Sequence, residues 1–252
     1  MKLGLVAALC LLCVGLLALT TGAQAQANGK IRLMVVTGGH DFDREAFFSI
    51  FQADQGLQYD EFQQPKANEA YVSGKAADYD AILLYDMAQD ITEEQQAALV
   101  KLLKEQGKGL VVLHHALGSY PKWDEYERIA GGRFCFGQWT LNGKEMPPST
   151  YAHGIRFTVQ IINKKHPITK GLTDFEVVDE VYGGFYVAPD VTRLLKVEHP
   201  QSGETVGWAH KYGKARVAAI QLGHDATAYN NDSFRKLLAR AIRWVARRPV
   251  GE

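Results

Sequence analysis

Arg216-Val-Ala-Ala-Ile-Gln-Leu-Gly-His-Asp225 is a largely apolar run that ends in a glycine, a histidine and an aspartate. Apolar residues at consecutive positions indicate a strand that is buried on both faces, as strands of parallel sheets are. The glycine lets the chain turn where the run ends, so His224 and Asp225 are predicted to follow the carboxyl end of this strand. In open α/β sheets, ligands bind outside the carboxyl ends of the strands. This stretch therefore predicts an α/β fold and the edge at which its site lies.

Two other apolar runs lead to histidines in the same way. Residues 31–37 lead to His40, and residues 109–113 lead to His114 and His115. Because the carboxyl ends of parallel strands lie at one edge of a sheet, we expect these histidines to gather in one crevice with the histidine of the first stretch. Adjacent residues of an extended chain point to opposite sides, so one of the two neighbouring histidines is predicted to face the crevice and the other to lie beneath it. The sequence leaves open which one.

Helical patterns alternate with the predicted strands. Asp43–Phe51 has an acidic first turn and an apolar face, and a second helix begins at Thr92 with a capping pattern and stops at Gly107. A further buried strand is predicted over Asp78–Tyr85, between these helices, and a last helix begins near Asn231. Strand, helix, strand alternation with short links predicts a doubly wound, mostly parallel α/β sheet.

Four later segments read as short strands that follow one another closely. A long irregular stretch that contains several glycines, from Gly131 to Thr150, precedes them and is typical of a functional loop. Because short links join antiparallel strands, we expect these segments to be partly antiparallel additions at the sheet edge. The predicted strands cover residues 157–162, 176–181, 192–197 and 206–210.

The first residues have the pattern of an export signal. Lys2 precedes an apolar run over residues 3–19, and Ala23-Gln-Ala25 has the small-x-small form of a signal-peptidase site. We therefore expect a signal peptide over residues 1–25, one domain over residues 26–252, and a periplasmic or secreted protein without stable membrane insertion. The alternative is a membrane anchor, which the short and interrupted apolar run disfavours.

Charge balance and cysteine content exclude some classes of protein. The chain has 28 Lys and Arg residues against 28 Asp and Glu residues, so it lacks the basic excess of a nucleic-acid-binding protein. Of its three cysteines, only Cys135 lies outside the predicted leader, so no intramolecular disulfide is expected in the mature chain. The mature chain is long enough for one sizeable apolar core to hold the fold together.

A set of ordered motifs resembles one known family. The motifs are Gly38-Gly-His40, Leu113-His-His-Ala116, His166-Pro-Ile-Thr-Lys-Gly-Leu172, Asp179-Glu-Val-Tyr182 and Leu222-Gly-His224. Over residues 31–246 the chain resembles the ThuA-like, or trehalose-utilisation-like, family. The resemblance implies the class I glutamine amidotransferase-like fold, which is a flavodoxin-like sheet with helices on both sides. It also implies a link to bacterial carbohydrate metabolism, through the uptake and breakdown of disaccharides and of oxidised 3-keto sugars.

One departure from the wider superfamily bears on mechanism. Amidotransferases of this fold carry a nucleophilic cysteine in a sharp Gly-x-Cys-x-Gly turn after a central strand. The equivalent turn here reads Leu113-His-His-Ala-Leu117, without cysteine or serine. Cys135 lies in the irregular stretch and is expected to behave as a small apolar residue. Glutamine hydrolysis by a cysteine nucleophile is therefore not expected.

The candidate site residues are acid/base groups and hydroxyl ligands near these strand ends. In Asp179-Glu-Val-Tyr182, alternation places Glu180 and Tyr182 on one face, a pair suited to proton transfer or to binding sugar hydroxyls. His153 follows the irregular stretch and is expected to close over the crevice. The alternative is that all of these are ordinary structural residues. The predicted catalytic residues are His114, His115, Glu180 and His224, and the predicted substrate-binding residues are His40, Asp41, His153, Tyr182 and Asp225.

Histidines and carboxylates in one crevice also raise the question of a metal. Imidazole with Asp or Glu is a ligand set for zinc or another divalent transition ion. The sequence has no local ligand spacing such as His-x-x-x-His, so a divalent metal ion is a candidate cofactor only through the predicted fold. No other cofactor is predicted.

Two main hypotheses for function follow. The first is an exported enzyme, a hydrolase or lyase, that acts on a disaccharide or an oxidised 3-keto glycoside by acid/base chemistry without a cysteine nucleophile. The second is a noncatalytic carbohydrate-binding or accessory protein on the same fold. A third hypothesis, an amidase that uses water activated by a bound ion, depends on the metal. The partner predicted by the first two is a small carbohydrate, and the sequence leaves the oligomeric state open.

Overall fold

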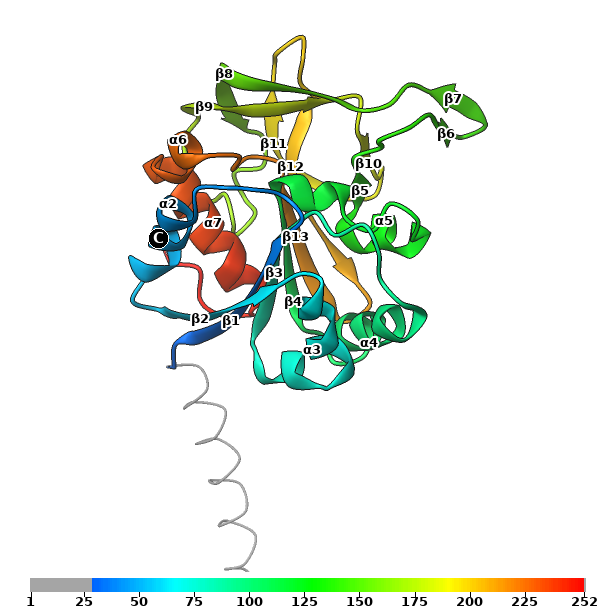
Figure 1. The fold of residues 1–252 in the computed structure, drawn as a ribbon. Coiled ribbons are helices and arrows are strands. Elements are labelled where there is room, and N and C mark those ends of the chain that lie inside the picture. Colours follow the sequence, from blue (N-terminus) through cyan, green and yellow to red (C-terminus); the bar gives the residue numbers. More distant parts are fainter. Residues whose placement is uncertain (1–28, 252) are drawn as a thin grey trace, which may run out of the picture. The chain divides into compact units, whose positions relative to one another are not determined.

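The structure is a computed structural model that describes residues 29–251. The predicted signal peptide, over residues 1–25, lies outside the described residues. From Ile31 onward, the described chain forms a nine-stranded sheet with helices on both faces (Figure 1). Within residues 29–251, no helix is both long enough and apolar enough to cross a membrane.

The sheet has a parallel half and an antiparallel half. Its first five strands pair in parallel, and the other four pair antiparallel to their neighbours. This topology confirms the predicted fold class, a doubly wound and mostly parallel sheet with antiparallel additions at one edge. In hydrogen-bonded order the strands are β2 (Leu57–Gln63), β1 (Ile31–Gly38), β3 (Ala81–Asp86), β4 (Gly109–Leu113), β13 (Ala215–Ile220), β12 (Thr205–Tyr212), β11 (Thr192–Val197), β8 (Thr150–Ile161) and β9 (Phe175–Gly183).

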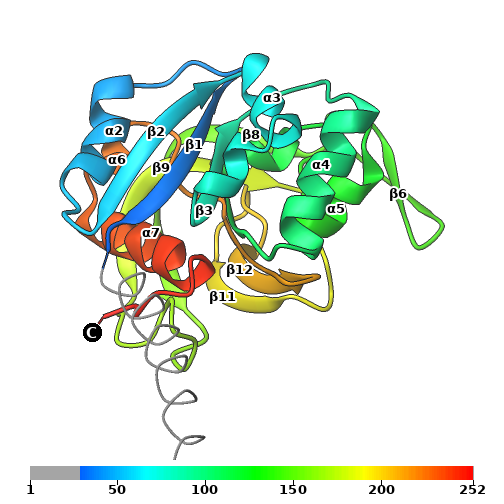
Figure 2. The same ribbon diagram turned by 90° about the horizontal axis from the view of Figure 1, so that it is seen from below.

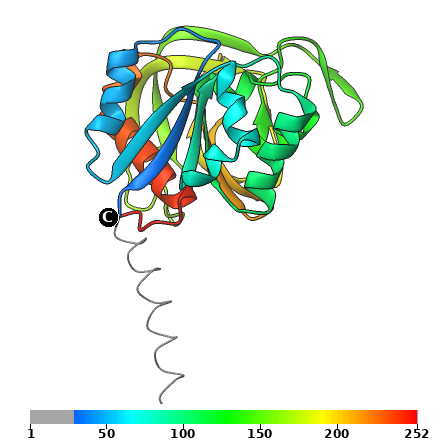
Figure 3. The same ribbon diagram turned by 60° about the horizontal axis from the view of Figure 1, so that its bottom comes forward.

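Helices cover both faces of the parallel half because its strands are apolar on both faces. In β1, Leu33 and Val35 pack into one core cluster, and Met34 and Val36 pack into a second cluster on the other face. Figures 2 and 3 show the two helical layers on either side of the sheet. The first layer contains α2 (Arg44–Gln52), α6 (Ala226–Tyr229) and α7 (Asp232–Val245), and the second contains α3 (Glu69–Val72), α4 (Glu93–Lys104) and α5 (Asp124–Ala130).

Capping side chains fix the starts of the two longest helices. The Thr92 hydroxyl accepts a hydrogen bond from the backbone N–H of Gln95, and the Gln95 side chain accepts one from the backbone N–H of Thr92. This reciprocal pair is a capping box, as the sequence predicts. Asn231 caps α7 by accepting from the backbone N–H groups of Ser233 and Phe234. Both predicted helix starts are therefore confirmed.

Other parts of the fold are weakly marked in the sequence. β2 is an edge strand with mostly exposed or half-buried residues, so it has no continuous apolar run. The irregular stretch encloses short strands that pair outside the main sheet. These are β5 (Gly132–Arg133) with β10 (Tyr186–Val187), and β6 (Trp139–Leu141) with β7 (Lys144–Met146). Short 3-10 helices are η1 (Lys66–Asn68), η2 (Lys75–Asp78) and η3 (His114–Gly118).

The antiparallel half bends back over the parallel half. In Figure 1, β8 and β9 run across the top of the sheet, above β4 and β13. Hydrogen bonds join these layers: Gln221 donates from its side chain to the backbone oxygen of Glu180 at 3.0 Å, and the backbone N–H of Gly223 donates to the carboxylate of Asp179 at 2.7 Å. β9 is last in the hydrogen-bonded order, yet it contacts the loop that follows β13. The bend therefore brings the two halves together at the carboxyl ends of the parallel strands.

Candidate functional site

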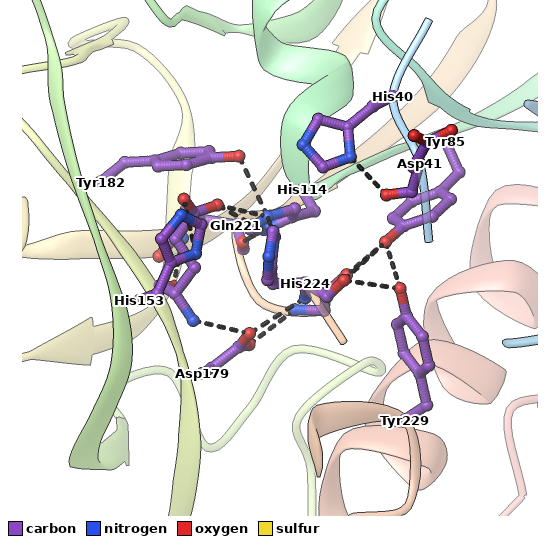
Figure 4. Close-up of polar contacts among 12 residues, drawn as sticks. His40, Asp41, Tyr85, His114, His153, Asp179, Tyr182, Gln221, His224 and Tyr229 are labelled. Atoms are coloured by element: carbon purple, nitrogen blue, oxygen red, sulfur yellow. Dashed lines mark hydrogen bonds and ion pairs between the residues drawn. The ribbon is translucent and has the colours of Figure 1, made fainter. Parts of the chain in front are cut away.

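Three strand ends of the parallel half deliver histidines to one place. His40 follows β1, His114 and His115 follow β4 as the first residues of η3, and His224 follows β13. The ring centroids of His40 and His115 are 4.6 Å apart, those of His40 and His224 are 5.6 Å apart, and those of His114 and His224 are 5.2 Å apart. Figure 4 shows three of these imidazoles, His40, His114 and His224, beside Tyr182 and His153.

His114 is held in an uncommon backbone conformation beneath the site. Its φ is +52°, in the left-handed region that residues with a Cβ seldom adopt, and its side chain is fully buried. Its Nδ1 lies 2.5 Å from the backbone oxygen of Gln221. A carbonyl oxygen only accepts, so Nδ1 carries a hydrogen, and in the neutral tautomer Nε2 presents a lone pair. The turn after β4 thus holds a buried imidazole.

The carboxylate of Glu180 lies among imidazoles. Its Oε2 is 2.8 Å from Nε2 of His114 and 3.2 Å from Nδ1 of His224. Its Oε1 is 3.3 Å from Nδ1 of His153. The Tyr182 hydroxyl donates to Nε2 of His114 at 3.0 Å. We call Glu180, His114, His224, His153 and Tyr182 the Glu180 cluster.

Opposing effects set the charge state of Glu180. Burial raises the pKa of the Glu180 carboxyl, but hydrogen bonds with His114 and His224 outweigh burial and hold that pKa well below its usual range. The hydrogen bond with Glu180 in turn raises the pKa of His224 above its ordinary value. Burial raises the pKa of the Tyr182 hydroxyl well above its ordinary value, so it stays a donor. The cluster therefore contains an anionic carboxylate, and this carboxylate favours positive charge on the groups beside it.

A second set of polar groups fixes the loop after β13. The Asp179 carboxylate accepts hydrogen bonds from the backbone N–H groups of Gly223 (2.7 Å), His224 (2.9 Å) and Glu180 (2.8 Å). Tyr85 donates to the backbone oxygen of Gly223 at 2.8 Å, and Tyr229 donates to that of His224 at 2.7 Å (Figure 4). These contacts fix the position of the His224 imidazole relative to β9.

His115 resolves the question of which adjacent histidine faces the crevice. It lines the pocket above Glu180, whereas His114 lies beneath it. The residue is 3% exposed, and neither ring nitrogen has a hydrogen-bond partner among the described residues. Burial lowers the pKa of His115 well below its ordinary value, and the neighbouring His114 and His40 lower it further. One donor and one acceptor nitrogen are therefore buried beside the pocket without a partner among the described residues.

The pocket combines these polar groups with aromatic walls. Its volume is about 450 Å³, within the range of small-molecule sites. Phe136 and Tyr151 are 48% and 62% exposed, so they offer apolar ring faces at its mouth. The residues that line the pocket are His40, Met87, His115, Gly118, Phe134, Phe136, Ser149, Tyr151, His153, Glu180 and Tyr182.

Two predicted site residues lie apart from this pocket. Asp41 is exposed and lines a separate hollow next to β1, and its backbone oxygen is 2.7 Å from Nδ1 of His40. The Asp225 carboxylate caps α6 by accepting from the backbone N–H of Thr227 at 2.8 Å. Cys135 is also outside the pocket lining, and burial raises the pKa of its thiol. The carboxylates of Asp41 and Asp225 form no hydrogen bond or ion pair with the Glu180 cluster among the described residues.

Other residues of the site are ones that the sequence does not single out. Phe134, Phe136 and Tyr151 form the apolar wall, and Tyr85 supports the loop after β13 from beneath. Tyr85 ends a predicted buried strand, so its position at a strand end is a signal that could have been used. The other three belong to or follow the irregular stretch, and nothing in their local pattern separates them from core aromatics.

Three side chains are placed so that they could hold a metal ion. His114, Glu180 and His224 each offer one ligand atom, and these atoms all lie within 4.8 Å of one another. The donors are two imidazole nitrogens and one carboxylate oxygen, a set that suits divalent transition ions.

Comparisons with known proteins place the chain in a family. The profile of the ThuA family, described as trehalose utilisation, matches residues 32–245. A solved ThuA-like protein from Parabacteroides merdae has 20% identity and a TM-score of 0.72, over 88% of this chain and 92% of that one. A ThuA-like protein from Bacteroides uniformis has 20% identity and a TM-score of 0.62, over 87% of this chain and 93% of that one. A comparison with curated protein sequences finds no match. The fold and the family match agree with the predicted resemblance, and the chain belongs to the ThuA family.

Proposed function

We propose that this protein is an exported enzyme that acts on a disaccharide or its oxidised 3-keto derivative by acid/base chemistry without a cysteine nucleophile. One observation carries the proposal: Glu180, a carboxylate at a pocket wall, has imidazoles beside both of its oxygens. Such a pair of groups can remove a proton from one atom and return it to another. The family description, trehalose utilisation, supplies the substrate class.

The pocket suits a sugar in size and in lining. A volume of about 450 Å³ holds a small ligand of this kind, and Phe136 and Tyr151 can stack on the apolar faces of sugar rings. His115 forms part of the pocket wall, and its buried nitrogens have no partner among the described residues, so a small movement of the ring would let it bind a hydroxyl or a keto oxygen. His40 stacks on His115 at 4.6 Å and extends this polar wall.

The residues that touch the pocket take different roles from those beneath it. Proton transfer is assigned to the pair formed by Glu180 and His153, whose Nδ1 is 3.3 Å from Oε1 of Glu180. A ketone at C3 acidifies the proton on C2, and the glycosidic oxygen on C1 is then placed for elimination. The base takes the C2 proton, the enolate expels the C1 oxygen, and the acid protonates that oxygen. His114 is a positioning residue in this scheme, because it is fully buried and does not line the pocket.

The alternative, a noncatalytic carbohydrate-binding protein, is favoured by the turn after β4. This turn presents His114 and not a nucleophile, and the exposed Phe136 and Tyr151 would serve a binder equally well. The two functions differ in turnover but share ligand binding.

The test is a substrate screen on the purified protein. Native disaccharides, trehalose included, and their 3-keto derivatives are incubated with the protein, cleavage is followed by NMR, and binding is followed by thermal shift. The proposal expects cleavage of at least one of them, with the 3-keto form faster than its parent. A thermal shift without cleavage would establish the binding function in its place. Neither cleavage nor shift for any sugar would contradict both functions.

A further inference from the structure

We infer that His114, Glu180 and His224 together bind one divalent transition-metal ion of the zinc class at the floor of the pocket. The three donor atoms form a compact triangle. Nε2 of His114 is 2.8 Å from Oε2 of Glu180, and Nδ1 of His224 is 3.2 Å from each of these atoms. The residues come from three separate elements, η3, β9 and the loop after β13, and all three direct a donor atom to this point.

The three donor atoms face one another. His114 donates its Nδ1 hydrogen to the backbone oxygen of Gln221, so its neutral form has a bare nitrogen at Nε2. That nitrogen accepts a hydrogen bond from the Tyr182 hydroxyl at 3.0 Å, and it also faces a carboxylate oxygen and a second imidazole nitrogen, both within 3.2 Å. If all three atoms present lone pairs, they repel at this separation unless positive charge lies among them. A metal ion supplies that charge, and a proton shared within the triangle is the competing explanation.

The size of the triangle fits a small ion with little rearrangement. Zinc bonds to imidazole nitrogen and to carboxylate oxygen are about 2.0–2.2 Å, which places tetrahedral ligands roughly 3.4 Å apart. The observed separations of 2.8 to 3.2 Å are a few tenths of an ångström shorter. An ion therefore needs the side chains to move outward slightly, and the backbone can stay where it is.

The groups behind the triangle are those that support metal ligands in other proteins. A ligating histidine normally donates its second nitrogen to a carbonyl or carboxylate, which fixes its tautomer. The backbone oxygen of Gln221 does this for His114 at 2.5 Å. The Asp179 carboxylate holds the backbone N–H groups of Glu180 and His224, at 2.8 and 2.9 Å, and so sets the positions of the two other ligands.

Three protein ligands leave a coordination position for substrate. Zinc sites that act in catalysis keep such an open position, whereas structural sites use four protein ligands. Glu180 also lines the pocket, so the open side of the triangle lies next to the space where a ligand binds. This part of the inference rests on the proposed function: the ion would take a hydroxyl or keto oxygen of the sugar, and Oε1 of Glu180 would remain beside His153.

The test is metal binding in the absence of any sugar. Protein purified with a chelator and then dialysed is titrated with Zn²⁺ by calorimetry and with Co²⁺ by visible absorption. We expect one ion per chain and an absorption band typical of nitrogen and oxygen ligands. His224→Ala and Glu180→Gln each remove one ligand and are expected to weaken binding by more than about 100-fold, since loss of a supporting group alone costs about 10- to 100-fold. His199→Ala, a histidine outside the cluster, is expected to bind as the wild type does. Circular dichroism checks that each variant is folded.

Several results would overturn the inference. One is the absence of a stoichiometric ion in the wild type. Another is equal affinity for the ion in the wild type, His224→Ala and Glu180→Gln. Either result would leave the shared proton as the explanation. Full turnover of a sugar by the chelator-treated protein would overturn the part of the inference that gives the ion's open position to the substrate, while the proposed function stood. An ion bound through these ligands, without turnover of any sugar, would support the inference and contradict the proposed enzyme.

Discussion

The parallel and antiparallel halves of the sheet supply the site in different ways. His40, His114 and His224 come from the parallel half, and each follows the carboxyl end of a strand. Glu180 and His153 come from the antiparallel half, and each lies within a strand, in β9 and β8. In a parallel sheet the strand end defines a common edge. In an antiparallel sheet the carboxyl ends of neighbouring strands lie at opposite edges. Glu180 and His153 therefore reach the site because β8 and β9 bend over the edge of the parallel half.

The two halves also differ in how firmly they are packed. All residues of β3 and β4 are buried, whereas the first half of β8, which carries His153, is mostly exposed. Rigid strand ends thus hold the buried imidazoles, and a more open strand carries the groups at the mouth of the pocket. The carboxylate of Glu180 on β9 contacts imidazoles from both halves, His114 and His224 from the parallel half and His153 from the antiparallel half.

The largest effect is expected on removing the carboxylate that the antiparallel half contributes. Glu180→Gln keeps the shape of the side chain and removes its charge, so turnover of a sugar substrate is expected to fall by about 10²- to 10⁴-fold, the range for loss of an acid/base group. Steady-state kinetics on the best substrate of the screen would measure the fall. Urea unfolding of the same variant would show whether the fold is kept.

Glu176→Gln is the matched control for that experiment. Glu176 lies on the same strand, its side chain is 58% exposed, and it pairs with Arg156 on β8. Exposed ion pairs contribute little to stability, so we expect turnover and unfolding close to those of the wild type. If the two variants had the same turnover, Glu180 would have no special part in the reaction.

The second-largest effect is expected on stability, from a buried carboxyl group in the parallel half. Asp86 ends β3 but lies away from the pocket, where burial raises its carboxyl pKa to about 7 despite a hydrogen bond from Gln64 at 2.8 Å. Between about pH 4 and pH 7 the folded protein holds a proton that the unfolded chain has released, so the free energy of unfolding falls as the pH rises. The loss is roughly 4 kcal/mol, at about 1.4 kcal/mol for each pH unit.

Asp86→Asn removes the titrating group and leaves a polar side chain of the same size. The free energy of unfolding of this variant is expected to change less between pH 4 and pH 8 than that of the wild type. The variant therefore becomes more stable relative to the wild type as the pH rises. Urea unfolding at both pH values is the measurement. Asp90→Asn, at a side chain that is 83% exposed, is the control and is expected to follow the wild type. Parallel curves for Asp86→Asn and the wild type would refute the raised pKa.

The smallest effect separates two roles for Asp225. The structure places its carboxylate as the cap of α6, with a bond to the N–H of Thr227 at 2.8 Å, and not in the pocket. Asp225→Ala is therefore expected to cost about 1 kcal/mol of the free energy of unfolding, the usual value for a lost cap. Sugar affinity, measured by calorimetry, is expected to stay within about twofold. If Asp225→Ala lost sugar affinity and kept the wild-type free energy of unfolding, Asp225 would be a substrate-binding residue.

Much of the fold can be read from local patterns. Continuous apolar runs mark β1, β3, β4 and β13 because parallel strands are buried on both faces, and capping residues such as Thr92 mark helix starts because the first N–H groups need acceptors. β2 is missed because an edge strand with half-buried residues carries no such run. The short strands of the irregular stretch are missed for the same reason, since each is only two or three residues long.

The order of residues already specifies which strands are buried, where they end, and that histidines follow three of those ends. Strand pairing in parallel then brings His40, His114 and His224 to one edge, because parallel strands share a direction. The contact of Glu180 with them follows from the folded sheet alone, since β9 is separated from β13 by three other strands and returns by bending over the edge. Local patterns record burial and turns, whereas the closeness of distant residues depends on the curvature of the whole sheet.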